Sequence, residues 1–246
     1  MSFADKTVLI TGANRGIGQA LVTEALRRGA RRVYAGTRRP ITHPDDRVTP
    51  LTIDVTDAAQ VRAAAGSIES LDVLVNNAGV ALSDDLSAPA AFDQHFAVNL
   101  FGTHRVTQAF LPSLTASRGA VVNVLSVAAL AAVPMLPSYS VSKAAAFSMT
   151  QSLRALVAAE GVRVHAVLAG PVDTDMTRDL DVPKAGTEAV ARAIFDGVDN
   201  GEEEIFPDPL TEPMAAGWHT GAVKDLERAN AALLAALLAA AVPAAP

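Results

Sequence analysis

The chain has 246 residues, half of them hydrophobic and 19% charged, which excludes a disordered protein and supports a large buried core. Its net charge of −6 disfavours nucleic-acid binding, although residues 1–50 alone carry about +5, which suits a small phosphorylated ligand. There is no cysteine, no apolar leader and no run of roughly 20 apolar residues, so we expect a cytoplasmic protein without disulfides, thiolate metal sites or a membrane span.

The first predicted strand, residues 7–10, leads into a glycine-rich turn and then a helical pattern over residues 19–29. Strand, glycine turn and helix N-terminus in this order predict a pyrophosphate site, because backbone N–H groups there face the ligand. The spacing Gly-x-x-x-Gly-x-Gly differs from the common Gly-x-Gly-x-x-Gly, and an ordinary turn is the alternative. The expected cofactor contacts are Gly12, Asn14, Arg15, Gly16, Ile17 and Gly18.

The second predicted strand, residues 32–36, ends at Thr37, Arg38 and Arg39. In a dinucleotide fold this position meets the adenosine ribose, where a carboxylate favours a free 2′-hydroxyl and an arginine favours a 2′-phosphate. The acid is absent here, so Thr37 and Arg38, with help from Arg15, predict NADP(H). For arginines 27, 28, 31 and 32, a solvated helix face is at least as good an explanation as a phosphate-binding patch.

The next strands are predicted at residues 48–53 and 72–75. Asp54 and Val55 follow the first of them and are placed to contact adenine, and Asp57 is a suitable N-cap for a helix reaching residue 69. Two asparagines follow the second strand and can brace the sheet, and a plain turn is the alternative. Three residues there are expected beside a ribose: Asn77, Ala78 and Gly79.

A long amphipathic helix is predicted over residues 89–114, with Asn99 inside it. Asparagine is an indifferent helix former, so a buried one is expected to have a polar task. We expect Asn99 to kink the helix and to hold a water that leads toward Lys143.

Tyr139 and Lys143 lie one turn apart on a helix predicted over residues 139–160, and Ser126 follows a strand at residues 121–125. The ammonium is expected to lower the phenol pKa toward neutral pH, where general acid–base catalysis is efficient. The Ser126 hydroxyl is placed to hold the carbonyl oxygen that the phenol protonates. Taken alone, the Tyr-x-x-x-Lys spacing is also common in surface pairs.

A strand at residues 162–168 precedes three further cofactor candidates, Pro171, Val172 and Thr174. A helix over residues 187–198, capped by Thr187, and a strand over residues 204–206 complete the alternation. This alternation predicts one α/β domain with a Rossmann-type, doubly wound parallel sheet of about seven strands. We divide the chain into residues 1–208, the dinucleotide-binding and catalytic domain, and residues 209–246, a helical extension packed on it. Its leucines 233, 234, 237 and 238 form a stripe that indicates a packed or subunit-contact helix.

These motifs together resemble the short-chain dehydrogenase/reductase family. The resemblance is carried by Thr11-Gly12-x-x-x-Gly16-Ile17-Gly18, Asn76-Asn77-Ala78-Gly79, Asn99, Ser126 and Tyr139-x-x-x-Lys143. It implies that Tyr139 donates or accepts the proton, that Ser126 orients the carbonyl, that Lys143 binds the nicotinamide ribose, and that Asn99 holds a relay water. It further implies NADP(H) as cofactor and a homodimer or homotetramer. The family's usual Pro-Gly after the sixth strand is reversed here as Gly170-Pro171.

We therefore predict an NADP(H)-dependent oxidoreductase, a carbonyl reductase or alcohol dehydrogenase that acts on an uncharged, apolar carbonyl or alcohol compound. The expected pocket comprises Ser126, Val127, Val133, Met135, Leu136, Val172 and Met176. One alternative is a non-catalytic NADP(H)-binding regulator on the same fold, which would not need a proton relay. Another is a lyase or dehalogenase, which would lack the glycine turn and the lysine. The five histidines show no metal-ligand spacing, so no metal is predicted and each histidine is expected to be structural or exposed.

Overall fold

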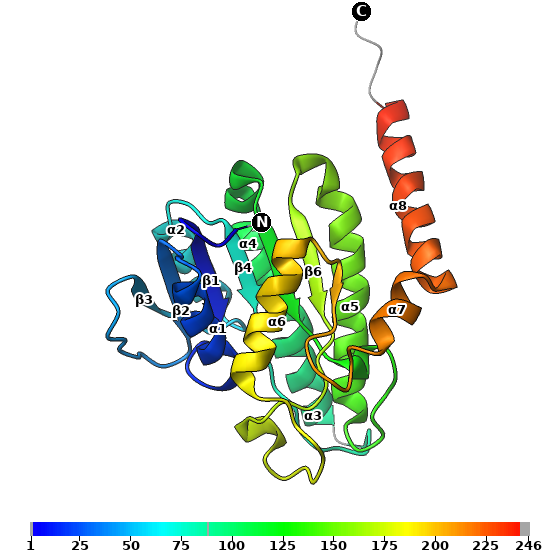
Figure 1. Cartoon of the computed structure of the whole chain (residues 1–246), viewed down its shortest axis with the longest axis horizontal. Helices are drawn as coiled ribbons and strands as arrows, with labels where there is room; N and C mark the ends of the chain where they lie inside the picture. The colour runs from blue at the N-terminus through cyan, green and yellow to red at the C-terminus, as the bar shows by residue number, and fades with distance from the viewer. Residues whose placement is uncertain (1, 88, 242–246) are drawn as a thin grey trace, which may run out of the picture.

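The computed structural model describes residues 2–87 and 89–241, and the remaining residues of the predicted domain and tail lie outside this part. A seven-stranded parallel sheet forms its centre, in the order β3-β2-β1-β4-β5-β6-β7 (Figure 1). The chain winds outward from β1 in one direction and then from β4 in the other, as predicted for a doubly wound sheet. The strands are β1 (Thr7–Thr11), β2 (Arg32–Thr37), β3 (Val48–Thr52), β4 (Val73–Asn76), β5 (Ala120–Val124), β6 (Arg163–Val167) and β7 (Glu204–Ile205).

Burial along the strands explains why helices must cover both faces. Every residue of β1, β4 and β5 is buried, whereas in β3 at the edge only Val48 is buried and the following residues are half-buried or exposed. Continuous apolar strands are typical of a parallel sheet that is covered on both sides. In Figure 1, α1 and α6 lie on one face, and α4 and α5 lie on the other.

The helices follow the predicted alternation. They are α1 (Gly16–Arg27), α2 (Ala58–Ser67), α3 (Pro89–His95), α4 (Thr103–Ser117), α5 (Pro137–Val157), α6 (Thr187–Asn200), α7 (Met214–His219) and α8 (Ala222–Ala241). Asp57 caps α2 as predicted, since its carboxylate accepts from the N–H groups of Ala59 and Gln60. The N-cap predicted for α6 is wrong by one position: Gly186 is the cap and Thr187 is the first helical residue.

The predicted helix over residues 89–114 is not continuous. A π-helical segment, η1 (Phe96–Gly102), separates α3 from α4 and contains Asn99. A π segment inserts extra backbone into a helix and is frequent at functional sites. Asn99 therefore lies where the helix departs from regular α geometry, and the kink and the water expected there stay predictions.

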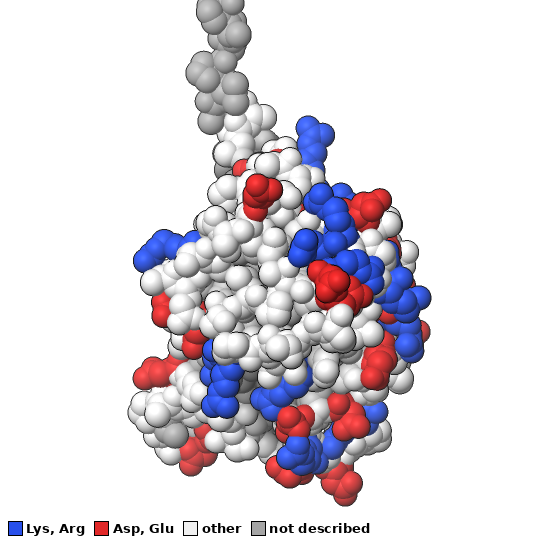
Figure 2. Space-filling view, turned by 90° about the vertical axis from the view of Figure 1, so that its left-hand side faces the viewer, with Lys and Arg blue, Asp and Glu red and all other residues white. Residues whose placement is uncertain are grey.

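Several arginines of the N-terminal third have structural partners. Arg28 is bound by Glu24 of its own helix and by Asp196 and Asp199 of α6, at 2.6–2.9 Å, so it fastens α1 to α6. Arg27 also pairs with Glu24. On the face that Figure 2 shows, basic and acidic side chains mix around a central area without charged residues.

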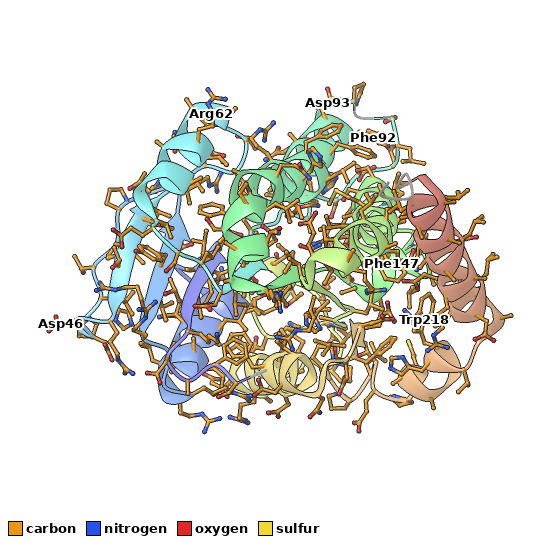
Figure 3. All side chains as sticks on the ribbon, turned by 90° about the horizontal axis from the view of Figure 1, so that it is seen from above. Asp46, Arg62, Phe92, Asp93, Phe147 and Trp218 are labelled. Carbon is orange, nitrogen blue, oxygen red and sulfur yellow. The ribbon has the colours of Figure 1, made fainter. Side chains whose placement is uncertain are left out.

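The C-terminal helices lie beside α5. Trp218 of α7 packs on Phe147 of α5, with ring centroids 5.5 Å apart (Figure 3). Helix α8 is attached through its first turns and then stands away from the body (Figure 1). Leu233 and Leu237 are each 60% exposed, so the predicted leucine stripe is largely open to solvent within the described residues. Among those residues, no helix combines the length and apolar character needed to cross a bilayer.

Candidate functional site

The glycine turn after β1 has a backbone that only glycine readily adopts. Gly12 and Gly16 have φ values of +67° and +55°. A Cβ on Gly18 would lie 2.2 Å from the carbonyl oxygen of Gly12, so helix α1 approaches the turn too closely for any side chain there. Thr174 lies against Gly16 from the other side, at 3.1 Å from an added Cβ. The turn, the start of α1 and the segment after β6 thus form one cradle at the carboxyl edge of the sheet.

Asn77 fixes this turn to the neighbouring strand. Its side-chain amide donates to the carbonyls of Thr11 and Gly12, at 2.9 and 3.2 Å, and the Thr11 hydroxyl accepts from the N–H groups of Asn77 and Ala78. Asn76 is buried and donates to Thr107 and Asn123. The interpretation that the two asparagines brace the sheet is confirmed.

Two exposed arginines stand beside the cradle. The Arg15 guanidinium contacts the carboxylate of Asp175 at 2.7 Å, and Asp175 also pairs with Arg178. Hydrogen bonding from Arg15 and the charge of Arg178 lower the pKa of Asp175. Arg38 is exposed at the end of β2.

Two of the predicted cofactor side chains are already bound locally. The Thr37 hydroxyl donates to the carbonyl of Arg39 at 2.6 Å, and the Asp54 carboxylate accepts from Thr56. The Val55 carbonyl accepts from Arg105 at 2.6 Å. The Thr37 hydroxyl and one carboxylate oxygen of Asp54 are therefore engaged by nearby groups of the chain.

Ser126, Tyr139 and Lys143 come together at the carboxyl end of β5. Ser126 caps the short 3₁₀ turn η2 (Val127–Ala129) and hydrogen-bonds the phenol of Tyr139. The Lys143 ammonium lies 5.7 Å from the centroid of the Tyr139 ring and donates to the carbonyl of Val124 at 3.0 Å. Lys143 is only 6% exposed, and burial lowers its pKa to about 8. Among the described residues, no carboxylate pairs with it.

The expected lowering of the Tyr139 pKa is wrong for this structure. Burial raises the pKa of the phenol, and the hydrogen bond with Ser126 offsets only part of that rise. The ammonium of Lys143 faces a backbone carbonyl rather than the phenol oxygen, and desolvation disfavours the phenolate. The Tyr139 phenol is consequently neutral at neutral pH.

Asn99 joins the loop after β4 to α5. Its amide accepts from the N–H of Val80 and donates to the Val80 carbonyl and the Ser142 hydroxyl, at 2.9–3.0 Å. A Cβ on Gly79 would lie 3.4 Å from Asn99 and 3.8 Å from the Lys143 ammonium, so these groups enclose one small space. Both N–H bonds of the Asn99 side chain are taken by protein groups.

The predicted substrate residues do not form one surface. Val172 is 3% exposed and belongs to the core beneath α1 and α6, whereas Met135 and Met176 are 66% and 49% exposed. Val127, Val133 and Leu136 are half-buried near Ser126. A cavity of about 590 Å³ lies instead beside the glycine turn, between the starts of α1 and α6. The Gly170-Pro171 order has a local reason, because a Cβ on Gly170 would lie 2.9 Å from the Asp208 carboxylate.

Residues 6–184 match the family model described as short chain dehydrogenase. The chain belongs to the short-chain dehydrogenase family. It is 35% identical over 207 residues to the 2-(R)-hydroxypropyl-CoM dehydrogenase of Xanthobacter autotrophicus, covering 76% of this chain and 83% of the relative. It is 33% identical over 210 residues to the oxidoreductase UcpA of Salmonella typhimurium, covering 77% and 80%. The crystal structure of a short chain dehydrogenase from Burkholderia cenocepacia in complex with NADP superposes with a TM-score of 0.84, at 38% identity and with 89% and 95% of the two chains covered.

Within this short-chain dehydrogenase, sequence reasoning missed a chain of interacting side chains beside Tyr139, of which His95 and Ser138 are buried. His95 is fully buried and contacts the edge of the Tyr139 ring, with centroids 5.9 Å apart. It also contacts Ser138, which contacts Asp84. The available signal was His95 four residues before Asn99, a spacing that usually places two side chains on one helix face.

Proposed function

We propose that this short-chain dehydrogenase is an NADP(H)-dependent reductase of ketones or aldehydes, or a dehydrogenase of the corresponding alcohols. The observation that carries the proposal is the meeting of Ser126, Tyr139 and Lys143 beside the glycine cradle. Gly12 and Gly16 have positive φ, and an added Cβ on Gly18 would collide with the Gly12 carbonyl, so the turn has the tight backbone and the close approach to α1 that a pyrophosphate-binding turn requires. When bound, NADPH supplies the hydride for the carbonyl carbon.

The residues of the chain supply the remaining steps. Ser126 orients the carbonyl oxygen, and Tyr139 gives it a proton, which its raised pKa keeps available at neutral pH. The Lys143 ammonium, 5.7 Å from the centroid of the Tyr139 ring, then stabilises the remaining phenolate through its charge alone, while its hydrogen bond stays with the Val124 carbonyl. Asn99 holds the loop and α5 in place through Val80 and Ser142, and a relay water at Asn99 stays a prediction.

Tyr139→Phe tests the catalytic assignment. We expect kcat to fall at least about 100-fold, since the phenylalanine ring fills the same space without a proton to give. NADPH oxidation against a panel of ketones, aldehydes and β-ketoesters measures the effect. Tyr34→Phe, on β2 and away from these groups, is the matched control and should keep its activity. Near-normal turnover of Tyr139→Phe would refute the role of the phenol. NADPH binding without consumption on the whole panel would favour a regulator.

Arg38→Ala tests the NADP(H) preference. An exposed guanidinium at the end of β2 suits a 2′-phosphate, and its loss should lower kcat/KM for NADPH about 10-fold or more while leaving NADH nearly unchanged. Arg32→Ala, at the opposite end of the same strand and bound to Thr49, is the control. Equal use of NADPH and NADH by the unmodified protein would contradict the preference.

The assembly into a homodimer or homotetramer also stays a prediction. The side chains of Phe101 in η1 and Leu156 in α5 are 54% and 59% exposed. Both are therefore available for such a contact.

A further inference from the structure

His95 stands where three segments meet. It is the last residue of α3, it is fully buried, and its two ring nitrogens contact different parts of the chain. Nε2 accepts the backbone N–H of Leu82 at 2.9 Å, and Nδ1 lies 2.7 Å from the hydroxyl of Ser138. The Ser138 hydroxyl in turn lies 2.6 Å from a carboxylate oxygen of Asp84. The chain of contacts ties the loop after β4 to the first turn of α5.

The donors and acceptors of this chain allow a single arrangement. The backbone N–H of Leu82 can only donate, so Nε2 carries no proton and the neutral ring carries its proton on Nδ1. Nδ1–H donates to the Ser138 hydroxyl, which donates its own hydrogen to Asp84. All partners are satisfied when His95 is neutral and Asp84 is ionised.

Tyr139 is in direct contact with this chain of hydrogen bonds. It follows Ser138 in the chain, and its ring meets the edge of the His95 imidazole at an interplanar angle of 69°. The N-cap of α5, Leu136, provides no side-chain cap to hold the first turn. The side-chain contacts of Ser138, Ser140 and Ser142 therefore fix the turn that carries the phenol.

We propose that His95 and Ser138 are positioning residues for Tyr139, and that the chain Leu82–His95–Ser138–Asp84 clamps the loop after β4 onto the start of α5. This inference rests on the proposed role of Tyr139 in the reaction. Neither His95 nor Ser138 needs to touch the substrate. They hold the phenol and the loop after β4 in fixed positions relative to each other.

The clamp requires an uncharged imidazole. A proton on Nε2 would face the N–H of Leu82, placing two donors against each other. Burial lowers the pKa of His95, Asp84 on the loop raises it in part, and Lys143 on α5 lowers it further. The net shift is downward, so the ring is neutral at pH 7. Acidification below about pH 6.5, the ordinary value for histidine, begins to favour an opened clamp.

The test compares His95→Ala, which removes the ring, with His95→Gln, whose amide can accept from Leu82 and donate to Ser138 without titrating. We expect His95→Ala to lower kcat between about 10- and 100-fold, as for a displaced catalytic group, with little change in the Kd of NADPH. His95→Gln should recover most of the activity at pH 7.5 and lose less of it on acidification than the unmodified protein. His104→Gln, an exposed histidine on α4, is the control.

A second readout does not depend on turnover. The chain has two tyrosines, so in a Tyr34→Phe background the tyrosinate absorbance reports Tyr139 alone. Opening the site to water should move the titration of Tyr139 toward lower pH in His95→Ala and, less strongly, in Ser138→Ala, and should leave it in place in His95→Gln.

The outcomes separate the two proposals. An unchanged phenol titration in His95→Ala and Ser138→Ala, or equal shifts in the Ala and Gln variants, would overturn the clamp. Ser138→Ala removes one hydroxyl only, so it keeps the test valid if His95→Ala does not fold. Failure of the reductase assignment would appear as NADPH binding without consumption on the whole substrate panel, and it leaves the titration readout intact.

Discussion

Two buried lysines have pKa shifts in opposite directions, because their ammonium groups have different partners. Lys224 on α8 is 1% exposed and contacts Glu203, Glu204 and Glu227 at 2.6–3.0 Å. Burial lowers its pKa, but the hydrogen bonds of Glu203 and Glu204 raise it above the ordinary value. Lys143 at the carboxyl edge has a backbone carbonyl as its partner, and burial lowers its pKa to about 8.

The different partners distinguish a structural cluster of ion pairs at Lys224 from an uncompensated buried charge at Lys143. Around Lys224 the charges satisfy one another, with Arg154 as a second cation, and the result is the attachment of α8 to α5 and β7. Three carboxylates lie close enough there to suggest a metal, but two cations already occupy them. Among the residues that the structure describes, no anion lies beside the Lys143 ammonium, a costly arrangement that is typical of functional sites.

The largest effect on stability is expected from Lys224→Met. Removing one partner from a buried ionic group leaves carboxylates uncompensated and should lower the free energy of unfolding by about 3–5 kcal/mol. Urea denaturation at pH 7.5 measures it, and kcat of the folded fraction should remain close to normal. Arg228→Ala, which breaks the exposed pair with Asp225, is the control and should cost less than about 1 kcal/mol. Equal effects of the two variants would contradict the distinction between paired and exposed charge.

Lys143→Met is expected to lower turnover and to raise stability, the reverse of the effects of Lys224→Met. Turnover should fall by about 10²–10³-fold, because the phenolate loses its stabilising cation. Stability should rise by about 1–3 kcal/mol at pH 7, since a folded pKa of about 8 against an ordinary 10.5 means that the buried charge opposes folding below pH 8. In the unmodified protein this penalty fades as the pH rises from about 8 to 10.5. Ser152→Ala, exposed on the same helix, is the control. A loss of stability in Lys143→Met would show that the ammonium is a structural group.

His165 gives a smaller test close to the charged cluster. It is buried on β6, its Nδ1 lies 2.6 Å from the carbonyl of Glu202, and burial lowers its pKa to about 4. The unfolded chain takes up the proton first, near pH 6.5, so stability that is complete above that pH is lost as the pH falls toward 4. We expect a loss of roughly 2 kcal/mol between pH 7 and pH 5 from this residue. In His165→Gln that part of the pH dependence should disappear, and an unchanged slope would assign it to other groups.

The sequence predicted what is encoded locally. Strand and helix order, the glycine turn, the Asp57 cap and the grouping of Ser126, Tyr139 and Lys143 follow from short patterns whose geometry depends on neighbouring residues. The pKa of Tyr139 was predicted in the wrong direction, because desolvation depends on everything packed around the phenol and not on the nearest cation alone.

Long-range contacts gave no readable signal. Arg15 and Asp175 are 160 positions apart, and His95 and Ser138 are 43 apart, so nothing in either local sequence indicates the pairing. Val172 was expected at the pocket as an apolar lining residue, but its side chain is 3% exposed and packs in the core. The π segment has no compositional signature that distinguishes it from the helices on either side.

The π segment also limits how this region tolerates insertions and deletions. An α-helix advances about 100° per residue, and the wider winding of η1 (Phe96–Gly102) offsets α3 against α4 by part of a turn. Deletion of one residue there would let α3, η1 and α4 form one continuous α-helix, and the imidazole of His95 would move away from the phenol of Tyr139. The number of residues in η1 therefore helps to set the position of His95 against the ring of Tyr139.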